Sequence, residues 1–530
     1  MHGNFELIDS NVYKNVLNYF KRVKINFFNT IKVFFIVFRI KLKHKFWKYK
    51  KRILFPCDNS IDLCFENLPL YLAVYKAGYN LEIYMPIRSL AMIPYYLLLG
   101  VSKFHFLFTI SPSNLRTKNF KLEFDFDKYI IPSILRKYRI ASINDLKEFD
   151  KKKEILDLRI ENLLNNFSKT NLENVESVFF TDYVYIPQGP LLDYIYTYHK
   201  NINILSYNAG HIVDTLVVSK LKTNLKNRHP YSPPFDVFIS RKKALNKKES
   251  LKLIANIRFQ LKGLYKNKEW FNYVRTSQYQ QFAEFKCEFG AKKVSNNSNS
   301  NIFAIFPHIY WDASVAAGDD LFSDYKEWFE TTVLYILENT KSNLIVKDHP
   351  SNLHKLNSLG IKYKSPIKSF LLSQKEEYKE RVIYLKPDTK ISTISVIEKS
   401  DYILTVRGTI GIEASLFGKN VIFAGTGRFN DYGFGIFPNN IDDYFRLIKK
   451  ASTSNFEIEE ENILNAALYL DILWNQMTFF QDTVKSIQND NGSNFLKNIN
   501  TINMKSILKD IDELSKWIEK PTSTYLKSKK

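Results

Sequence analysis

The stretch that decides the fold of this chain is DYILTVRGTIGIEASLFGKNVIFAGTGR, residues 401–428. It begins with a short apolar run typical of a buried strand, turns at Gly408, and continues with the small and apolar residues of a helix start. A second apolar run, NVIFA, follows and leads into a glycine-containing exit. Strand, tight turn, helix and strand in this order predict one unit of a parallel α/β sheet.

The same pattern recurs on both sides of a polar, patternless linker. Residues 51–85 and 175–211 each alternate apolar strand runs with helical segments, and the pattern starts afresh after residue 301. A chain of 530 residues with 45% hydrophobic content is too long for one ordinary core. The sequence therefore predicts an α/β protein with two Rossmann-like domains facing a cleft. The predicted boundaries are a basic segment 1–52, a first domain 53–289, a linker 290–301, a second domain 302–455 and a helical tail 456–530.

The positive charge of the chain is unevenly distributed. Residues 1–52 hold 13 Lys and Arg against two acids, a net +11 out of +22 for the whole chain. Apolar residues recur there near helical spacing, and no uncharged run is long enough to span a bilayer. The segment predicts an amphipathic helix on an anionic membrane surface, or alternatively a helix packed on the first domain with a solvated basic face. No stripe of arginines with stacking aromatics indicates nucleic-acid binding.

Cysteine usage and metal-ligand spacing exclude two classes of site. The three cysteines, Cys57, Cys64 and Cys287, form no CxxC pair or Cys/His cluster. A disulfide framework and a structural zinc are therefore not expected, and a reducing cytoplasm fits. Asp125 and Asp127 resemble a metal-binding pair but lie in a poorly patterned charged stretch, so no metal site is predicted.

Two charged residues follow a strand in the second domain. Lys347 and His349 come directly after the apolar run 344–346, and Pro350 ends the strand. Side chains at the carboxyl end of a parallel strand are well placed to neutralise a phosphate. A surface turn with incidental charge is the alternative.

The glycine turn of the opening stretch has two interpretations. Gly408 and Gly411 permit close backbone approach, and Thr409 offers a hydroxyl at a helix start whose free N–H groups suit a phosphate. Glu413 lies on the first turn, where it caps the helix or accepts from ribose hydroxyls. The turn lacks the Gly-Lys-Ser/Thr of a Walker A loop and the GxGxxG of a dinucleotide fingerprint. Taken alone it favours a structural corner; Arg407 either reaches a ligand's charge or braces the loop against an acid such as Asp388.

Further polar residues lie at other strand exits. One loop of the second domain holds His308, Asp312, Gly318, Asp319 and Asp320, and Asp388 follows another strand. The first domain offers Asp58, Asp182, Gln188 and His211. A general base for an acceptor hydroxyl is a possible role among these first-domain residues, although for each residue of these exits a helix cap or a structural hydrogen bond is the favoured alternative.

The order of these motifs resembles a known family. FPHIYWDAS, GDDLF, IVKDHP, PDTKISTIS and the opening stretch follow one another as in capsule polysaccharide biosynthesis proteins, which include Kdo transferases; the resemblance covers about residues 300–440. It implies a GT-B fold and a glycosyltransferase that needs no metal and no cofactor beyond its nucleotide-sugar co-substrate, such as CMP-Kdo. The implied donor-binding residues are Lys347, His349, Gly408, Thr409, Gly411 and Glu413; Asp388 and Arg407 are added as donor-binding candidates because of their positions at strand exits. Asp58, Asp182 and Asp312 are the candidate catalytic residues.

The implied acceptor is a surface polysaccharide or its lipid-linked primer, bound by the first domain. Together with the basic segment, this predicts a cytoplasmic enzyme that is peripheral on the inner face of the membrane. Three alternatives share the same plan: a CDP-alcohol phosphotransferase of the teichoic-acid type, a nucleotide-sugar epimerase, and a non-catalytic polysaccharide assembly factor.

Overall fold

The computed structural model describes most of the chain outside the N-terminal segment. The described residues are 35, 38, 51–57, 67–101, 103–107, 119–221, 229, 231–266, 300–312, 318–357, 364–482, 486–488, 495–497, 504–519 and 525–526. Phe35 and Phe38 are helical and are 61% and 49% exposed. Of the rest of the predicted basic segment, only Lys51 and Arg52 are described, and Arg52 begins the first strand of the sheet rather than extending a helix; Asp58 and residues 290–299 of the predicted linker lie outside the described residues. None of the described helices is both long and apolar enough to cross a membrane.

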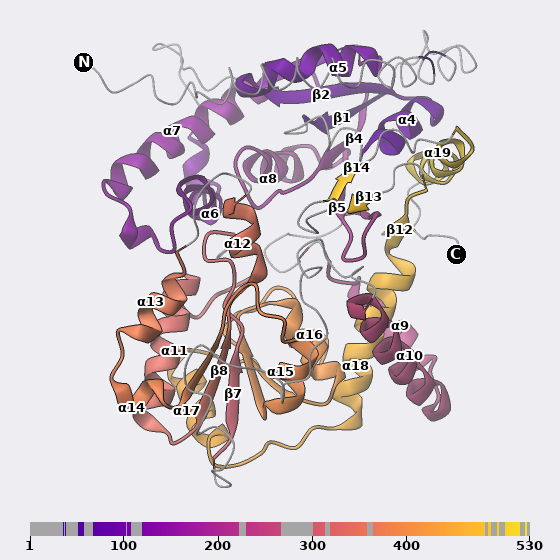
Figure 1. The fold of residues 1–530 in the computed structure, drawn as a ribbon. Helices are drawn as coiled ribbons and strands as arrows, with labels where there is room; N and C mark the ends of the chain where they lie inside the picture. The colour runs from indigo at the N-terminus through magenta and orange to yellow at the C-terminus, as the bar shows by residue number, and fades with distance from the viewer. Residues whose placement is uncertain are drawn as a thin grey trace.

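The first domain is built on a mostly parallel, seven-stranded sheet (Figure 1). Its strands run in the spatial order β12-β6-β5-β4-β1-β2-β3, in which β6 and β12 are antiparallel to their neighbours. The order 3-2-1-4-5 of the parallel strands is that of a Rossmann fold, with its topological switch point between β1 and β4. The strands are β1 (Arg52–Pro56), β2 (Asn80–Pro86), β3 (Lys103–Leu107), β4 (Val175–Phe180), β5 (Asn203–Ala209), β6 (Thr215–Lys220) and β12 (Thr478–Phe480).

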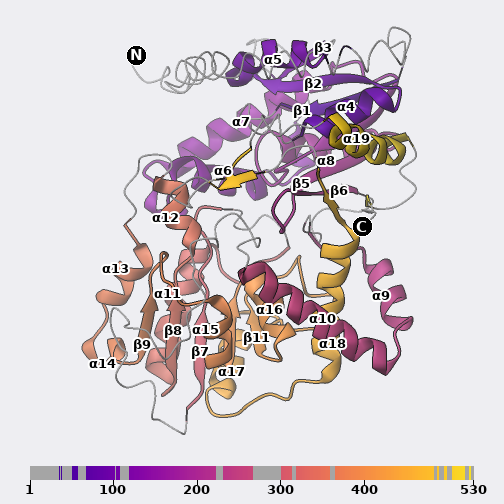
Figure 2. The ribbon, with the colours of Figure 1, turned by 45° about the vertical axis from the view of Figure 1, so that its right-hand side comes forward.

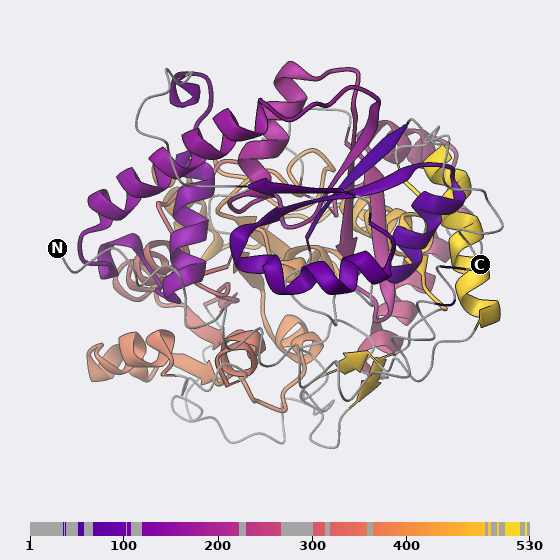
Figure 3. The ribbon, with the colours of Figure 1, turned by 90° about the horizontal axis from the view of Figure 1, so that it is seen from above.

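Helices cover both faces of this sheet, as the view from above shows (Figure 3). One face packs against α4, α5 and the C-terminal helix α19, and the other packs against α6, α7 and α8. The strands are buried because both faces carry apolar side chains, as expected for parallel strands. The helical segments are α4 (Leu68–Lys76), η2 (Ile87–Met92), α5 (Ile93–Leu98), η3 (Phe120–Leu122), α6 (Asp127–Tyr138), η4 (Ile143–Asp145), α7 (Phe149–Phe167), α8 (Gln188–Tyr198) and α19 (Met504–Glu519).

The second domain has a five-stranded, fully parallel sheet of the same topology. Its spatial order is β11-β10-β7-β8-β9, so its switch point lies between β7 and β10. The strands are β7 (Ile302–Ile305), β8 (Asn343–Lys347), β9 (Val382–Leu385), β10 (Tyr402–Thr405) and β11 (Asn420–Phe423). The prediction of two Rossmann-like domains in a GT-B-like arrangement is confirmed.

The helices of the second domain also form two layers. One face of the sheet packs against α11, α13 and α17, and the other packs against α15, α16 and α18. The helices are α11 (Tyr325–Asn339), α12 (Pro350–Asn357), α13 (Pro366–Leu372), α14 (Glu376–Lys379), α15 (Thr393–Lys399), α16 (Thr409–Leu416), α17 (Ile441–Ala451) and α18 (Glu460–Asp471).

Two segments pack on a domain other than the one their sequence position indicates. Helices α9 (Phe235–Lys243) and α10 (Lys247–Lys266) precede the predicted linker, yet they join the core of the second domain beside α16 and α18 (Figure 2). After α18 the chain returns through a short π-helix, Ile472–Gln476, to the first sheet as β12, and α19 packs against α4. The C-terminal segment therefore contains strands as well as helices, including a hairpin of β13 (Ser486–Gln488) and β14 (Phe495–Lys497).

The carboxyl ends of the two sheets meet at what we call the domain seam. The hydroxyl of Tyr185, after β4, donates to Asp312, after β7, at 2.6 Å. The guanidinium of Arg139 lies 4.1 Å from the ring centre of Trp311. On the other side of the seam, a guanidinium N–H of Arg428 lies 3.3 Å from Nε2 of a histidine that follows β5. The fold thus brings together the strand ends at which ligands of open α/β sheets bind.

Candidate donor site at the domain seam

The N-terminus of α16 lies directly at the switch point of the second sheet. Gly408 is the residue before the helix and has an extended backbone, and its N–H donates to the Thr405 hydroxyl at 3.3 Å. The N–H of Gly411 closes the first turn on the Gly408 carbonyl at 3.0 Å. The N–H groups of Thr409 and Ile410 and the Thr409 hydroxyl have no acceptor or donor in the part of the chain that the structure describes. A helix start with unused N–H groups is a binding site for an anion.

The two glycines of this turn have different structural roles. A Cβ on Gly411 would lie 2.3 Å from the Phe423 ring, so this glycine allows α16 to pack tightly on β11. A Cβ on Gly408 would lie 2.9 Å from the Thr405 hydroxyl and 3.5 Å from the His308 ring, at the strand end itself. The turn therefore fits both interpretations. Gly411 allows the close packing of a structural corner, and the backbone that follows Gly408 leaves N–H groups available to an anion.

Lys347 ends β8 as a buried cation. The residue is 6% exposed, and its ammonium has no hydrogen-bond or ion-pair partner among the residues that the structure describes. Burial lowers the pKa of Lys347 to about 8, against the opposing attraction of Asp348 and Glu413. A buried ammonium without a hydrogen-bonded counter-ion is costly. A bound anion would remove that cost.

The residues after Lys347 hold the strand exit in place. The fully buried Asp348 accepts from the Asn352 amide at 3.0 Å, the Ser365 hydroxyl at 2.7 Å and the Tyr384 hydroxyl at 3.0 Å. Nδ1 of His349 accepts from the N–H of Ser351 at 3.1 Å, at the start of α12. A neutral imidazole that accepts at Nδ1 carries its proton on Nε2, which is the donor that a phosphate oxygen needs.

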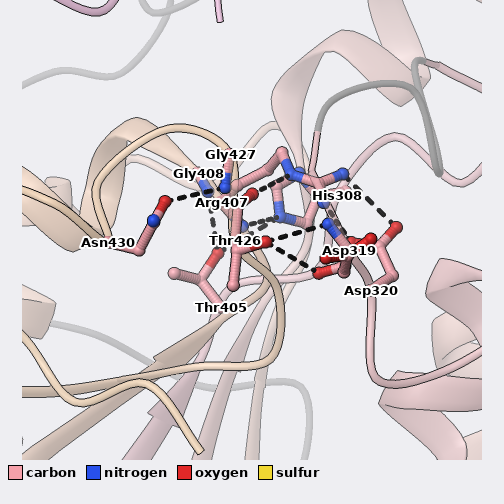
Figure 4. Close-up of polar contacts among 9 residues, drawn as sticks. All are labelled: His308, Asp319, Asp320, Thr405, Arg407, Gly408, Thr426, Gly427 and Asn430. Carbon is pink, nitrogen blue, oxygen red and sulfur yellow. Dashed lines mark hydrogen bonds and ion pairs between the residues drawn. The ribbon is translucent and has the colours of Figure 1, made fainter. Parts of the chain in front are cut away.

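Arg407 forms the centre of a second polar cluster at the switch point (Figure 4). Its buried guanidinium makes a two-pronged ion pair with Asp320, one prong at 3.3 Å. Burial disfavours its charge, but Asp320 outweighs this and raises the pKa of Arg407. The partner of Arg407 is thus Asp320; Asp388 is half exposed and pairs with Lys386 at 3.4 Å on a turn.

His308 lies beneath this cluster as a neutral acceptor. Its Nε2 lies 3.3 Å from the N–H of Arg407, which donates to it, and 3.2 Å from the Thr405 hydroxyl (Figure 4). Its ring stacks on Tyr325, with ring centres 4.3 Å apart. Burial, together with the nearby positive charge of Arg407, lowers the pKa of His308 well below its usual range. His308 therefore supports the backbone at Arg407 without adding charge.

Glu413 is buried on α16 and engages a helix from before the predicted linker. The residue is 2% exposed and accepts from the Tyr265 hydroxyl of α10 at 2.6 Å. Its attraction also reaches Lys347. This placement favours reinforcement of the loop over contact with a ribose.

Two of the candidate catalytic carboxylates lie at the seam: Asp182 follows β4 of the first domain, and Asp312 follows β7 of the second domain. Asp182 has a left-handed backbone (φ 48°) after β4, its side chain is 57% exposed, and it lies 3.5 Å from Arg136. The Arg136 guanidinium stacks 4.2 Å from the Tyr185 ring, and Tyr185 in turn donates to Asp312. The charges of Asp182 and Asp312 both act on Arg136, and Asp58 lies outside the described residues.

A pocket on the outer helices and the distribution of possible metal ligands do not mark a second site at the seam in the described residues. A pocket of about 690 Å³ is lined by Tyr335, Phe445 and Lys449 on the outer helices α11 and α17, away from the strand ends. No group of three or more His, Cys, Asp or Glu side chains that could hold a metal ion occurs in the described part of the chain.

Sequence reasoning did not single out several residues of the seam. Tyr265 carries no local signal, because only the packing of α10 on α16 brings it to Glu413. Arg428 does carry a local signal, since it ends the glycine-containing exit of β11 as a charged residue. Asp348 lies between Lys347 and His349, and its burial, which is unusual for an aspartate, is visible only in the fold.

Comparison with known proteins gives one sequence match. Residues 243–469 match the family model described as capsule polysaccharide biosynthesis protein. The predicted resemblance to this family is confirmed over these residues. The matched region begins just before α10 and ends within α18, so it corresponds to the second sheet together with the helices that pack on it. No curated protein matches the chain.

Solved structures with a similar arrangement were also found. KpsC from Thermosulfurimonas dismutans, a beta-Kdo 2,4 transferase, is 11% identical with a TM-score of 0.31 and covers 65% of this chain and 88% of its own. UDP-GlcNAc 2-epimerase from Neisseria meningitidis, bound to UDP-GlcNAc, is 14% identical with a TM-score of 0.23 and covers 79% and 98%. UGT89C1 from Arabidopsis thaliana, complexed with quercetin, is 10% identical with a TM-score of 0.27 and covers 88% and 98%.

Proposed function

We propose that this protein is a glycosyltransferase of capsule or cell-envelope polysaccharide biosynthesis that uses a nucleotide-activated sugar. The observation that carries the proposal is the pairing of the buried cation Lys347 with the unused N–H groups at the start of α16, two strands apart at one sheet edge. Both features bind oxyanions, and a nucleotide-sugar donor presents them at its phosphates. The family match of the same region agrees with this assignment.

The proposed chemistry is stabilisation of the leaving nucleotide without a metal. Breaking the bond between sugar and phosphate places additional negative charge on the nucleotide oxygen. Four groups would stabilise that charge: the ammonium of Lys347, the backbone N–H groups of Thr409 and Ile410, and the Nε2–H of His349. They need little rearrangement to do so. Burial makes each of these interactions stronger than it would be in water.

The proposed acceptor side is the first domain. An oxygen of Asp312 is already occupied by the Tyr185 hydroxyl, whereas the Asp182 side chain is 57% exposed at the end of β4. We therefore favour Asp182 over Asp312 as the base that takes the proton of the acceptor hydroxyl. Asp58 follows β1, which neighbours β4 at the switch point of the first sheet, and remains a candidate on the sequence.

We further propose that the protein works on the inner face of the cytoplasmic membrane. The net charge of +11 in residues 1–52 and the exposure of Phe35 and Phe38 support contact with anionic lipid. Removing residues 1–50 should release the protein from phosphatidylglycerol vesicles in a flotation assay while leaving activity on a soluble acceptor intact. Equal flotation of the truncated and full-length chains would contradict the membrane proposal.

Calorimetry with CMP, UMP, UDP, GDP and CDP tests the donor proposal directly. One nucleotide should bind the full chain. Thr409→Val should weaken its affinity several-fold, because valine has a similar volume to threonine but no hydroxyl to donate. The matched control is Thr453→Val on an exposed turn. Absence of binding by every nucleotide would contradict the proposal.

The matching sugar-linked donors then separate the enzyme classes. A glycosyltransferase releases the nucleotide and transfers the sugar to an acceptor glycan. An epimerase converts the donor without an acceptor, and a phosphotransferase of the teichoic-acid type transfers an alcohol phosphate from a CDP-linked donor. Either of the last two product patterns would overturn the glycosyltransferase proposal.

A further inference from the structure

Arg428 is a buried cation at the seam that pairs with no carboxylate of the residues that the structure describes. The residue is 7% exposed, and one guanidinium N–H donates to the Arg407 carbonyl at 3.2 Å. A second N–H lies 3.3 Å from Nε2 of His211, and Nε has no acceptor among the described residues. The Phe429 ring centre lies 4.8 Å from the guanidinium carbon. All of these partners are neutral, so the charge of Arg428 is not compensated by them.

The electrostatic surroundings of Arg428 differ from those of its neighbour Arg407. Burial lowers the pKa of Arg428, and the groups that oppose this effect are the phenols of Tyr469 and Tyr231, while Arg407 adds repulsion. Arg407 in contrast is neutralised by a two-pronged pair with Asp320. A buried guanidinium left without an anion is strongly unfavourable. The site is therefore complete only when an anion is present.

The neighbouring histidines add hydrogen-bonding capacity without adding charge. Burial, with the nearby charge of Arg428, lowers the pKa values of His211 and His229 well below their usual range, so both are neutral near pH 7. The His229 backbone N–H donates to the Gly427 carbonyl at 3.1 Å, which joins the first-domain side to the loop that carries Arg428. His211 and His229 are therefore neutral, and Arg428 carries the positive charge of this group.

The position of Arg428 relates it to the proposed donor site. Arg428 follows β11, and Thr409 follows β10, its parallel neighbour. Adjacent strands lie about 4.8 Å apart, so the two strand ends are roughly one sugar ring apart. Lys347 lies on the opposite side of β10, two strands away. Along the sheet edge, Arg428 therefore follows the strand on the far side of β10 from Lys347.

We propose that Arg428 binds an oxyanion carried by the glycan part of a substrate, at a subsite separate from the nucleotide phosphates. This inference rests on the proposed function, which places the donor phosphate at α16. The planar fork of arginine matches a carboxylate or a phosphate ester, and both are oxyanions of the required shape. The group belongs either to the transferred sugar or to the acceptor glycan, since His211 and His229 approach from the acceptor side of the seam.

Anomalous diffraction with selenate as the probe tests the subsite in the full chain. Crystals soaked in selenate with saturating CMP or UMP, whichever binds, should show a selenium peak within hydrogen-bond distance of Arg428 Nε. In Arg428→Gln the peak should disappear, while the nucleotide stays at α16. The matched control Arg446→Gln changes an exposed arginine of α17 and should keep the peak. Bound nucleotide without selenate at Arg428 in the wild-type protein would overturn the inference.

Solution measurements provide a second readout and locate the source of the anion. At constant ionic strength, sulfate should raise the Tm of the wild-type protein more than chloride does, and Arg428→Gln should weaken sulfate binding at least tenfold. Arg428→Lys keeps the charge but loses the fork, so it should show an intermediate effect. An effect on the donor KM alone assigns the anion to the transferred sugar, and an effect on the acceptor KM alone assigns it to the acceptor. A change in Tm with both KM values and sulfate binding unchanged would show that Arg428 only ties the domains together.

The two proposals fail in different ways. If no nucleotide binds but selenate occupies Arg428, the donor proposal falls and the oxyanion subsite stands. If nucleotide binds at α16 and Arg428 stays empty, the donor proposal stands and the subsite falls. The selenate soak of the wild-type protein decides this even if Arg428→Gln does not fold.

Discussion

Replacing Lys347 by Met should make the protein more stable at neutral pH while weakening its binding of nucleotide. The pKa of Lys347 falls from 10.5 in the unfolded chain to about 8 in the folded protein, because the ammonium is buried. Each unit of difference corresponds to about 1.36 kcal/mol, so the charged side chain costs the fold about 3 kcal/mol at pH 7. Met fills a similar volume without a charge and removes that cost.

The gain should depend on pH in a defined direction. Between pH 8 and pH 10.5 the unfolded chain holds the proton of Lys347 more than the folded chain does. The free energy of unfolding of the wild-type protein therefore rises with pH across this window, relative to a variant without the lysine. The advantage of Lys347→Met should fall from about 3 kcal/mol at pH 7 to about 1 kcal/mol at pH 10.

Urea unfolding at pH 7 and pH 10 measures this difference, and calorimetry measures the nucleotide affinity. Loss of a charged hydrogen-bond donor to phosphate costs about 1.5–3 kcal/mol, which corresponds to a roughly 10- to 100-fold weaker Kd. Wild-type binding at pH 8.5 should take up about 0.8 of a proton, because the bound phosphate restores the charge of Lys347. Lys399→Met, an exposed lysine on α15, should change neither property.

Two results would refute this reasoning about Lys347. A variant that is less stable than wild type by the same amount at pH 7 and pH 10 would mean that the ammonium has a satisfied structural role. Unchanged nucleotide affinity combined with a pH-dependent gain in stability would keep the burial argument but remove Lys347 from the donor site.

The remaining predictions concern α16 and its supports. Gly411→Ala should lower stability by about 1–3 kcal/mol in urea unfolding, because its Cβ would lie 2.3 Å from the Phe423 ring; a neutral effect would show that the helix can shift freely. Thr409→Val should leave the Tm within about 1 °C of wild type, since its hydroxyl has no partner in the described residues, so a large drop in Tm would indicate a structural bond. Tyr265→Phe should cost about 1.5–3 kcal/mol through loss of the hydrogen bond to Glu413, and an unchanged unfolding midpoint would argue against that bond.

Local sequence pattern was sufficient to predict most of the elements that position the site. Apolar runs bounded by glycine and polar residues marked β8, β10 and β11, because strands buried on both faces must be apolar throughout. Lys347 and the turn at Gly408 were predicted as strand-end residues, and the structure places both at carboxyl ends of the second sheet. A short-range rule sufficed here because a strand and its exit loop are adjacent in the chain.

Domain membership was less accessible to sequence reasoning than the elements themselves. The predicted end of the first domain at residue 289 separates α10 from the second-domain core that it joins. A polar linker in the sequence does not reveal on which domain the preceding helix packs. The predicted helical tail likewise contains β12, which pairs with β6 at the edge of the first sheet. Both placements depend on contacts between segments more than 100 residues apart, which leave no periodic signal.

Neighbouring residues are enough to predict the two α/β domains, the strand-end positions of Lys347 and Thr409, and the basic N-terminal composition. How the strand ends are neutralised depends on the tertiary fold. It paired Arg407 with Asp320, 87 residues away, and joined Asp312 to Tyr185 across the seam. It also left Lys347 and Arg428 buried without carboxylate partners among the described residues. Burial and charge pairing depend on which side chains meet in space, so the opening stretch shows where an anion can bind only once the fold is known.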